Sequence, residues 1–301
     1  MRRFAGFTDI LACTLTWASI SPIVQQLDAR ASLIVLFRVG VGALVVLGYA
    51  AARGRLSELR PRGNARLLIA SGLTLAVHWA MLFETYKRLE VAPAVALAFL
   101  GPIIGAVAAP FVLRERAHVR RVIALAIAFG GLAAITLPEI SSLDPLGVAF
   151  GIGSAITFAA LLLEGRVLSR TESPLSITAW QLGVATVPML IVLAGGTEGV
   201  ATGWPILIML GAVHTGLAGF LFFRAVAALE AHQLATMFYV EPAAAVVYAW
   251  IFLSQQPTPA MFTGFALIIG AGLLLVSEPS LPLLAPLASP ETLPAEEPGP
   301  A

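Results

Sequence analysis

Residues 234–253 read LATMFYVEPAAAVVYAWIFL, an apolar run long enough to cross a lipid bilayer as one helix. Glu241 stands near the middle of this run and is followed directly by Pro242. A carboxylate at bilayer depth is costly and normally faces a partner or a water-filled cavity. Proline lacks an N–H, so the carbonyl of Phe238 loses its helical donor. The stretch therefore predicts a polar pathway through a membrane helix.

A second stretch of the chain repeats this pattern at a fixed offset. Residues 89–106 match residues 229–246, and Pro102 aligns with Pro242 about 140 residues later. Pro102 frees the carbonyl of Ala98 in the same way. Interrupted helices at corresponding positions of two halves are the best sequence pointer to a transporter binding site. We therefore predict a duplicated unit with a site between its two copies.

The composition is that of a membrane protein. Of 301 residues, 58% are hydrophobic and 12% are charged, against about 25% charged in a typical soluble domain. The single Cys13 lies in the first apolar stretch, which excludes an intrachain disulfide. Ten apolar stretches are each long enough to cross the bilayer: 7–25, 31–52, 66–86, 91–112, 119–137, 145–163, 174–194, 204–223, 232–253 and 259–277.

The basic residues predict how these spans are oriented. With the N-terminus in the cytoplasm, 14 of the 18 Lys and Arg residues fall in inside segments and three in outside segments. This split favours cytoplasmic N- and C-termini in the inner (plasma) membrane. The cluster from Arg53 to Arg66 lies in a short inside loop, so we interpret it as a topology signal rather than a nucleic-acid partner site.

The predicted fold is an all-α polytopic membrane protein of ten transmembrane helices, arranged as two inverted five-helix repeats. An odd number of spans per half inverts the second half relative to the first. We place the first repeat at 1–138 and the second at 145–277. Residues 278–301 are Pro-rich, with seven prolines from Pro279 onward, and predict a disordered cytoplasmic tail.

Several polar and aromatic side chains fall inside the predicted spans. Trp17, His78 and His214 lie near mid-span and either line a cavity or pack as bonded core residues. Arg38 needs a partner or must snorkel, and we assign it a structural or gating role. The remaining candidates for substrate contact are Phe99, Tyr239 and Tyr248. Glu241 is a candidate proton-coupling group or a partner for a substrate amine, or else a protonated packing residue.

The motifs of several enzyme classes are missing from the sequence. It contains no P-loop, HExxH, CxxC pair or GxSxG, and its four histidines lack metal-site spacing. We therefore predict no cofactor, no metal and no enzymatic activity. An uncoupled facilitator is kept as an alternative to a coupled carrier, and a membrane enzyme ranks below both. A carrier for phosphate esters ranks below one for neutral or zwitterionic solutes, because Arg38 is alone within a span.

In order, these motifs resemble the EamA-type transporters of the drug/metabolite transporter superfamily. The resemblance covers about residues 7–277 and is carried by Phe37-Arg38, Leu97 with Pro102, Leu113-Arg-Glu115, the Gly-rich fifth span and Tyr239-Val-Glu-Pro242. It implies ten helices, a central cavity between the halves and movement of small organic solutes such as amino acids, often by export. One position departs from the family pattern, because Ser254-Gln-Gln256 replaces an acidic residue and leaves Glu115 without a symmetry mate for gating.

Overall fold

The computed structural model describes residues 2–113, 119–139, 142–226, 228–229, 237–238 and 240–276. The predicted tail after 277 therefore lies outside the described residues. Every regular element among the described residues is helical. The elements are α1 Arg2–Ala18, α2 Ile20–Gln26, α3 Ala31–Ala52, η1 Leu56–Leu59, α4 Ala65–Arg88, α5 Val91–Ala98, α6 Leu100–Leu113, α7 Val119–Thr136, η2 Leu137–Glu139, α8 Pro145–Leu168, α9 Pro174–Met189, η3 Leu190–Gly195, α10 Val200–Gly211, η4 Ala212–Leu217, α11 Ala218–Val226, α13 Val240–Leu253 and α14 Pro259–Val276.

Seven described segments are long and apolar enough to cross a membrane. They are Phe4–Gln26, Ala31–Ala52, Ala65–Arg88, Val91–Val112, Pro145–Leu168, Pro174–Gly195 and Val200–Phe222. Three shorter apolar helices complete the set at Val122–Thr136, Val240–Leu253 and Pro259–Leu274. Each of the ten apolar stretches predicted from the sequence overlaps one of these segments. The chain is thus an all-helical, multi-pass membrane protein.

Prolines explain where two of the long spans are interrupted. The first span breaks between α1 and α2 at Ser19, because Pro22 leaves the carbonyl of Ala18 without its i+4 donor. The fourth span breaks between α5 and α6 at Phe99, one residue after Ala98. This is the position at which Pro102 was predicted to free a carbonyl. Both breaks expose polar backbone groups inside an otherwise apolar bundle.

The stretch that carries Glu241 is helical where the structure describes it. Met237 and Phe238 are helical, and α13, Val240–Leu253, carries Glu241 and Pro242. The loss of a helical donor for the Phe238 carbonyl at Pro242 stays a prediction. Tyr239 and Glu115 both lie outside the described residues.

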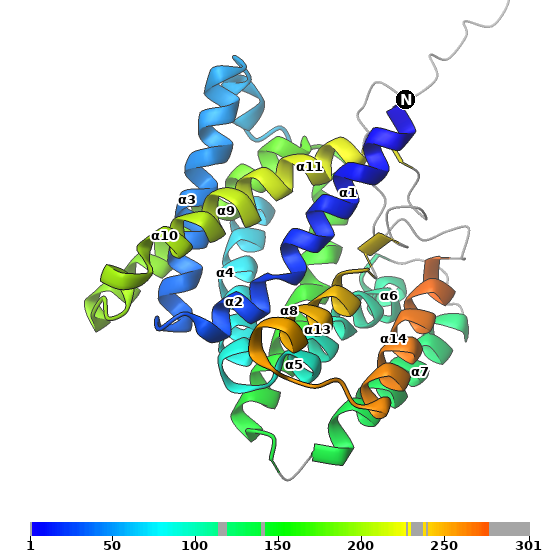
Figure 1. Cartoon of the computed structure of the whole chain (residues 1–301). Helices are drawn as coiled ribbons and strands as arrows, with labels where there is room; N and C mark the ends of the chain where they lie inside the picture. The colour runs from blue at the N-terminus through cyan, green and yellow to red at the C-terminus, as the bar shows by residue number, and fades with distance from the viewer. Residues whose placement is uncertain are drawn as a thin grey trace, which may run out of the picture.

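Helix packing follows a pattern that exchanges the two halves of the chain (Figure 1). The pair α4·α8 is matched by α11·α1, and α4·α9 is matched by α10·α3. Likewise α6·α8 is matched by α13·α1, while α3·α9 and α7·α14 each join equivalent helices. In the α7·α14 pair the backbones approach closely at Gly131 and Gly264. A Cβ on Gly131 would lie 2.6 Å from the Gly264 carbonyl oxygen.

At one end of the bundle, which we call the glutamine end, hydrogen bonds join the two halves. Gln25, at the end of α2, donates from Nε2 to the Leu89 carbonyl at 2.8 Å. Gln255, after α13, donates from Nε2 to Gln25 Oε1 at 2.8 Å and accepts from the Val91 N–H at 3.0 Å. Lys87 also donates to the Leu27 carbonyl. The helix ends from both halves are therefore tied together here.

The opposite end, which we call the arginine-rich end, carries the loops 53–64 and 169–173. Glu172 is buried and accepts hydrogen bonds from the N–H groups of Arg62 and Gly63, at 2.9 and 2.7 Å. Trp180 donates from Nε1 to the Leu59 carbonyl at 2.9 Å. A hydrogen bond from Arg55 lowers the pKa of Glu58 in the same loop. These contacts hold the two loops together at the arginine-rich end.

Candidate functional site

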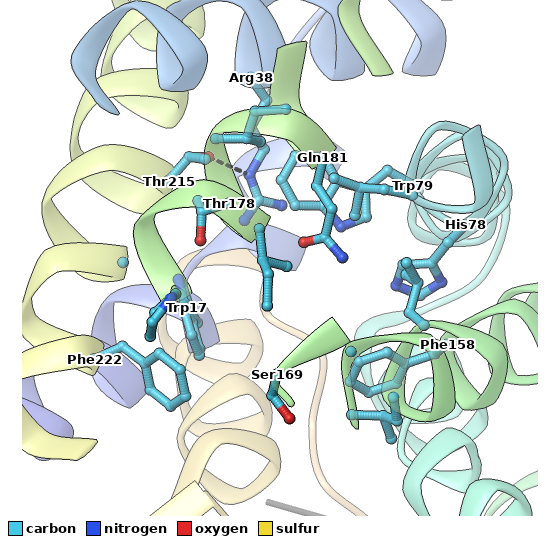
Figure 2. A pocket seen from close by; sticks show the side chains of 18 of the residues that line it. Trp17, Arg38, His78, Trp79, Phe158, Ser169, Thr178, Gln181, Thr215 and Phe222 are labelled. Carbon is cyan, nitrogen blue, oxygen red and sulfur yellow. Dashed lines mark hydrogen bonds between the residues drawn. The ribbon is translucent and has the colours of Figure 1, made fainter. Parts of the chain in front are cut away.

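A cavity of about 400 Å³ lies between the two halves, within the helical bundle (Figure 2). Most of its wall is apolar, with a few polar groups facing inward. The residues that line it are Trp17 of α1; Arg38 of α3; Leu75, His78 and Trp79 of α4; Phe158, Leu161, Leu162, Gly165 and Arg166 of α8, with Ser169 after it; Pro174, Ile177, Thr178, Gln181 and Leu182 of α9; His214 and Thr215 of η4; and Gly219 and Phe222 of α11. The cavity extends from the level of Arg38 toward the arginine-rich end.

Arg38 lines this cavity from the membrane-spanning part of α3. The residue is only 6% exposed. Its Nε donates to Thr215 Oγ1 at 2.9 Å, and its guanidinium carbon lies 4.2 Å from the centre of the Trp79 ring. A cation over an indole face is stabilised, most strongly where water is excluded. The arginine is therefore held inside the bundle instead of snorkelling to the surface.

His78 belongs to an uninterrupted part of α4 and is buried. Its Nδ1 lies 3.0 Å from the backbone carbonyl of Ser154, which can only accept, so Nδ1 carries the proton. Its ring stacks on Phe158, with ring centres 5.1 Å apart and planes 14° from parallel. The neutral ring then keeps Nε2 as a hydrogen-bond acceptor, because only one nitrogen is protonated.

His214 occupies the matching span of the second half, but its backbone is different. It lies in the π-helical turn η4, Ala212–Leu217. Its Nε2 lies 3.0 Å from Ser19 Oγ, and its carbonyl accepts from Trp17 Nε1 at 2.8 Å. Ser19 Oγ donates to the Thr16 carbonyl at 2.7 Å, so it accepts the proton on Nε2. Single π-helical turns occur mostly at functional sites.

An aromatic cluster forms one wall of the cavity beside His214. Trp17 lies 5.9 Å from Phe222 and 5.8 Å from Phe238 between ring centres, and Phe222 lies 5.6 Å from Phe238. Such offset and edge contacts are the favourable arrangements of aromatic rings. In Figure 2 this wall faces His78 and Phe158 across the cavity. An apolar solute can therefore be held between two aromatic surfaces.

Four of the residues predicted from the sequence meet at this cavity: Trp17, Arg38, His78 and His214. Phe99, Tyr248, Pro102 and Pro242 are not among its lining residues. Phe99 stands at the break between α5 and α6, and the ring of Tyr248 packs 6.1 Å from that of Phe252.

Glu241 lies close to the cavity without lining it. Its carboxylate interacts electrostatically with Arg38, Tyr86 and Cys13, which belong to three different helices. No hydrogen bond or ion pair joins it to the residues that the structure describes. Its role as a coupling group therefore stays a prediction.

Sequence reasoning had not assigned several cavity residues to the site. Gln181 occupies in α9 the position that Arg38 occupies in α3, seven residues from the start of each helix. This equivalence was visible in the sequence. Thr215 and Phe158 gave no such signal, because a threonine or phenylalanine in an apolar run is unremarkable.

The cavity offers several groups that can bind a solute. They are the two guanidinium groups of Arg38 and Arg166, two imidazoles and several aromatic faces, and the described lining includes no Asp or Glu. Within the described ranges, no three His, Cys, Asp or Glu side chains lie close enough together to hold a metal ion. Arg166 also lines the cavity, near its arginine-rich end.

Comparison with known proteins agrees with this geometry. Residues 5–137 and residues 145–277 each match the EamA-like transporter family. The chain belongs to the EamA-like transporter family. The two matches divide this EamA-like transporter close to the turn predicted between its halves, and together they cover most of the chain.

Curated relatives of this EamA-like transporter are themselves named as transporters. A probable terminal-alkyne amino-acid exporter of Streptantibioticus cattleyicolor is 25% identical over 281 residues, covering 90% of this chain and 93% of the relative. An uncharacterized transporter of Archaeoglobus fulgidus is 24% identical over 273 residues, covering 90% and 95%. A riboflavin transporter of Brucella anthropi is 28% identical over 199 residues, covering 62% and 67%.

A solved crystal structure shares the fold of this EamA-like transporter. Its TM-score is 0.66 at 18% sequence identity, and the match covers 94% of this chain and 99% of the other. At this identity the likeness concerns the fold alone. The family and the relatives' names indicate transport of small solutes across a membrane.

Proposed function

We propose that this EamA-like transporter is a secondary carrier that exports a small organic metabolite, an amino acid or a similar solute, by alternating access. The observation that carries the proposal is the cavity of about 400 Å³ lined by both halves. Ligand pockets typically measure about 300–1,000 Å³, so this one suits a solute of amino-acid size. The relative named as a probable amino-acid exporter supports the same substrate class.

The proposed architecture is ten transmembrane helices in two inverted repeats, residues 1–138 and 145–277, with both termini in the cytoplasm of an inner membrane. The packing pairs that exchange the two halves support the duplication. The arginine-rich end supports the orientation, because cytoplasmic loops carry an excess of Lys and Arg. The three shorter apolar helices would then also cross the bilayer, in a tilted or locally thinned arrangement.

The two ends of the bundle support alternating access. The cavity reaches Arg166, Ser169 and Pro174, all near the arginine-rich end. At the glutamine end, a hydrogen bond between Gln25 and Gln255 joins the halves, and neither residue lines the cavity. The described arrangement would thus accept substrate from the cytoplasm and release it once the glutamine end opens.

Glu241 is the proposed coupling group, either for protons or for a substrate amine. Glu241 interacts electrostatically with Arg38, and Arg38 lines the cavity. A change in the charge of Glu241 would therefore change the electrostatic potential in the cavity, because opposite charges interact strongly where water is scarce. A carboxylate without a hydrogen-bond partner among the described residues is free to exchange a proton. An uncoupled facilitator is the alternative, in which Glu241 only packs.

The deciding test is uptake of radiolabelled amino acids into proteoliposomes, with and without an imposed proton gradient. Accumulation driven by the gradient, and lost in Glu241→Gln with exchange of substrate retained, is the expected result. If the amino acid only equilibrates across the membrane, at the same rate with and without the proton gradient, the protein is an uncoupled facilitator. Absence of any flux across amino acids and other metabolite classes would contradict the carrier itself. Matched empty liposomes and Glu198→Gln, an exposed change near Gly199, serve as controls.

A further inference from the structure

Arg38 is fixed in the cavity more firmly than a membrane-anchoring arginine would be. Thr215 holds its Nε, Trp79 lies under its guanidinium, and Phe83 adds a second ring at 5.4 Å. These contacts come from both halves of the chain, Trp79 and Phe83 from α4 and Thr215 from η4. The direction of the guanidinium is therefore set before anything binds, which lowers the ordering cost of binding.

The charge of this arginine is not neutralised by contact. Within the part of the chain that the structure describes, no ion pair reaches Arg38, and its two Nη atoms donate no hydrogen bond. Glu241 acts on it electrostatically but makes no ion pair with it. A guanidinium removed from water needs hydrogen-bonded partners for all its donors, or burial is costly. An anionic oxygen pair that enters the cavity would supply partners for these donors and offset the charge.

Resting on the proposed function, we infer that the transported solute carries a carboxylate that binds the two Nη atoms of Arg38. Since Thr215 occupies Nε, the Nη pair presents the fork that accepts a carboxylate in bidentate fashion. The apolar part of the solute then lies between Trp17 and Phe222 on one side and Phe158 on the other. The inference assigns Arg38 direct substrate contact, where the sequence suggested a structural or gating role.

The groups near Arg38 favour a carboxylate over a phosphate. Thr178, Gln181 and Thr215 lie near Arg38 in Figure 2, and all three are neutral. The other guanidinium of the lining, that of Arg166, lies toward the arginine-rich end. One guanidinium among neutral groups matches the single charge of a carboxylate better than a phosphate dianion.

The test measures binding to the purified full-length protein in detergent by titration calorimetry. The probes are L-phenylalanine, its amide, 3-phenylpropanoate, 3-phenylpropanamide and phenyl phosphate. Both carboxylates are expected to bind at least tenfold more tightly than their amides and than phenyl phosphate. In Arg38→Gln this preference should vanish, and in Arg38→Lys it should fall without vanishing, since an ammonium lacks the fork. Arg224→Gln, which removes an exposed partner of Asp9, is the matched control and should bind as the unchanged protein does.

Equal binding of acids and amides, tighter binding of phenyl phosphate, failure of every carboxylate probe, or an undiminished preference in Arg38→Gln would each overturn the inference. If Arg38→Gln does not fold, the Arg38→Lys titration and the acid–amide preference of the unchanged protein decide alone. Counterflow in proteoliposomes separates the two proposals. Equal flux of acids and amides would leave the carrier standing and remove the carboxylate anchor, whereas binding without any flux would remove the carrier.

Discussion

The helix that carries His78 and the helices that carry His214 are counterparts in the two halves, yet their backbones differ. The first is a regular α-helix from Ala65 to Arg88. The second is interrupted by the π-helical turn η4, between α10 and α11. His78 Nδ1 lies 3.0 Å from the Ser154 carbonyl and 3.2 Å from its hydroxyl, whereas His214 Nε2 lies 3.0 Å from the Ser19 hydroxyl and its Nδ1 3.5 Å from the Met209 carbonyl. Duplication supplied two similar helices, and only one of them acquired a turn that reshapes the cavity.

The difference shows how a symmetric scaffold can bind an asymmetric solute. The π-helical turn aims Thr215 at Arg38 and turns the His214 carbonyl toward Trp17. In the second half, Gln181 of α9 stands at the position that corresponds to Arg38 of α3 and carries no charge. The two equivalent positions therefore offer the cavity a guanidinium and a neutral amide. A solute with one anionic end would bind in a single orientation.

The largest effect is expected from deleting Val213, a partly lipid-facing residue of η4. Removing one residue should convert the π-helical turn into regular α-helix and break the bonds of Thr215 to Arg38 and of Trp17 to His214. Two lost hydrogen bonds, one of them to a charged group, correspond to about a 100-fold fall in transport. Proteoliposome flux measures this fall.

The matched deletion is Val77, which faces outward from α4. Because a regular helix turns about 100° per residue, this deletion should rotate half of α4 out of its packing and prevent folding. Size-exclusion profiles and circular dichroism separate the two cases. Full transport after deletion of Val213 would show that the π-helical turn has no role in the site.

A smaller effect is expected from Thr215→Val, which keeps the shape of the side chain and removes its hydroxyl. Nε of Arg38 then loses its acceptor, and the guanidinium can turn away from the cavity. Substrate affinity should fall by about tenfold, as for the loss of one hydrogen bond to a charged group. Calorimetry with the carboxylate probes gives the value.

Thr186→Val is the control for this change, because its hydroxyl bonds only to the Leu182 carbonyl of its own helix. It should leave affinity unchanged. An equal loss of substrate affinity in both variants would show that the hydrogen bond from Arg38 to Thr215 has no special role. It would contradict the proposed difference between the two halves at this position.

The smallest effect should separate the two histidines themselves. Ser19→Ala strands the Nε2 proton of His214 and should lower the free energy of unfolding by about 1 kcal/mol. Ser154→Ala leaves the backbone carbonyl that holds His78, so its cost should stay below about 0.5 kcal/mol. Thermal unfolding in detergent compares them directly. A larger loss of unfolding free energy in Ser154→Ala than in Ser19→Ala would show that the serine hydroxyl is more important for His78 than for His214, the opposite of this prediction.

Much of the fold could be predicted because the length of an apolar stretch and the position of a proline each determine the structure of the segment that contains them. The ten apolar stretches and the break beside Phe99 follow from these two signals alone. Four residues of the site, Trp17, Arg38, His78 and His214, could be predicted from the sequence. Polar and large aromatic side chains are unusual in the middle of a membrane span, so each of them was a candidate for lining a cavity.

The rest of the site could not be read from local signals. Thr215 matters through a distance to Arg38 across 177 positions, which only tertiary packing sets. The π-helical turn of η4 has no sequence mark comparable to proline or glycine. The aromatic wall around Trp17 likewise depends on which face α11 turns inward.

The hydrogen bonds at the glutamine end set an energy scale for the proposed alternating access. Two of them cross between the halves, from Gln255 to Gln25 and from the Val91 N–H to Gln255. In the proposed opening of that end, water would replace each partner, so each bond would contribute a net of only about 1 kcal/mol. The two bonds together would disfavour opening by about 2 kcal/mol, or roughly thirtyfold. A solute that binds the open form about thirtyfold more tightly would offset this contribution, so substrate binding is strong enough to break these bonds.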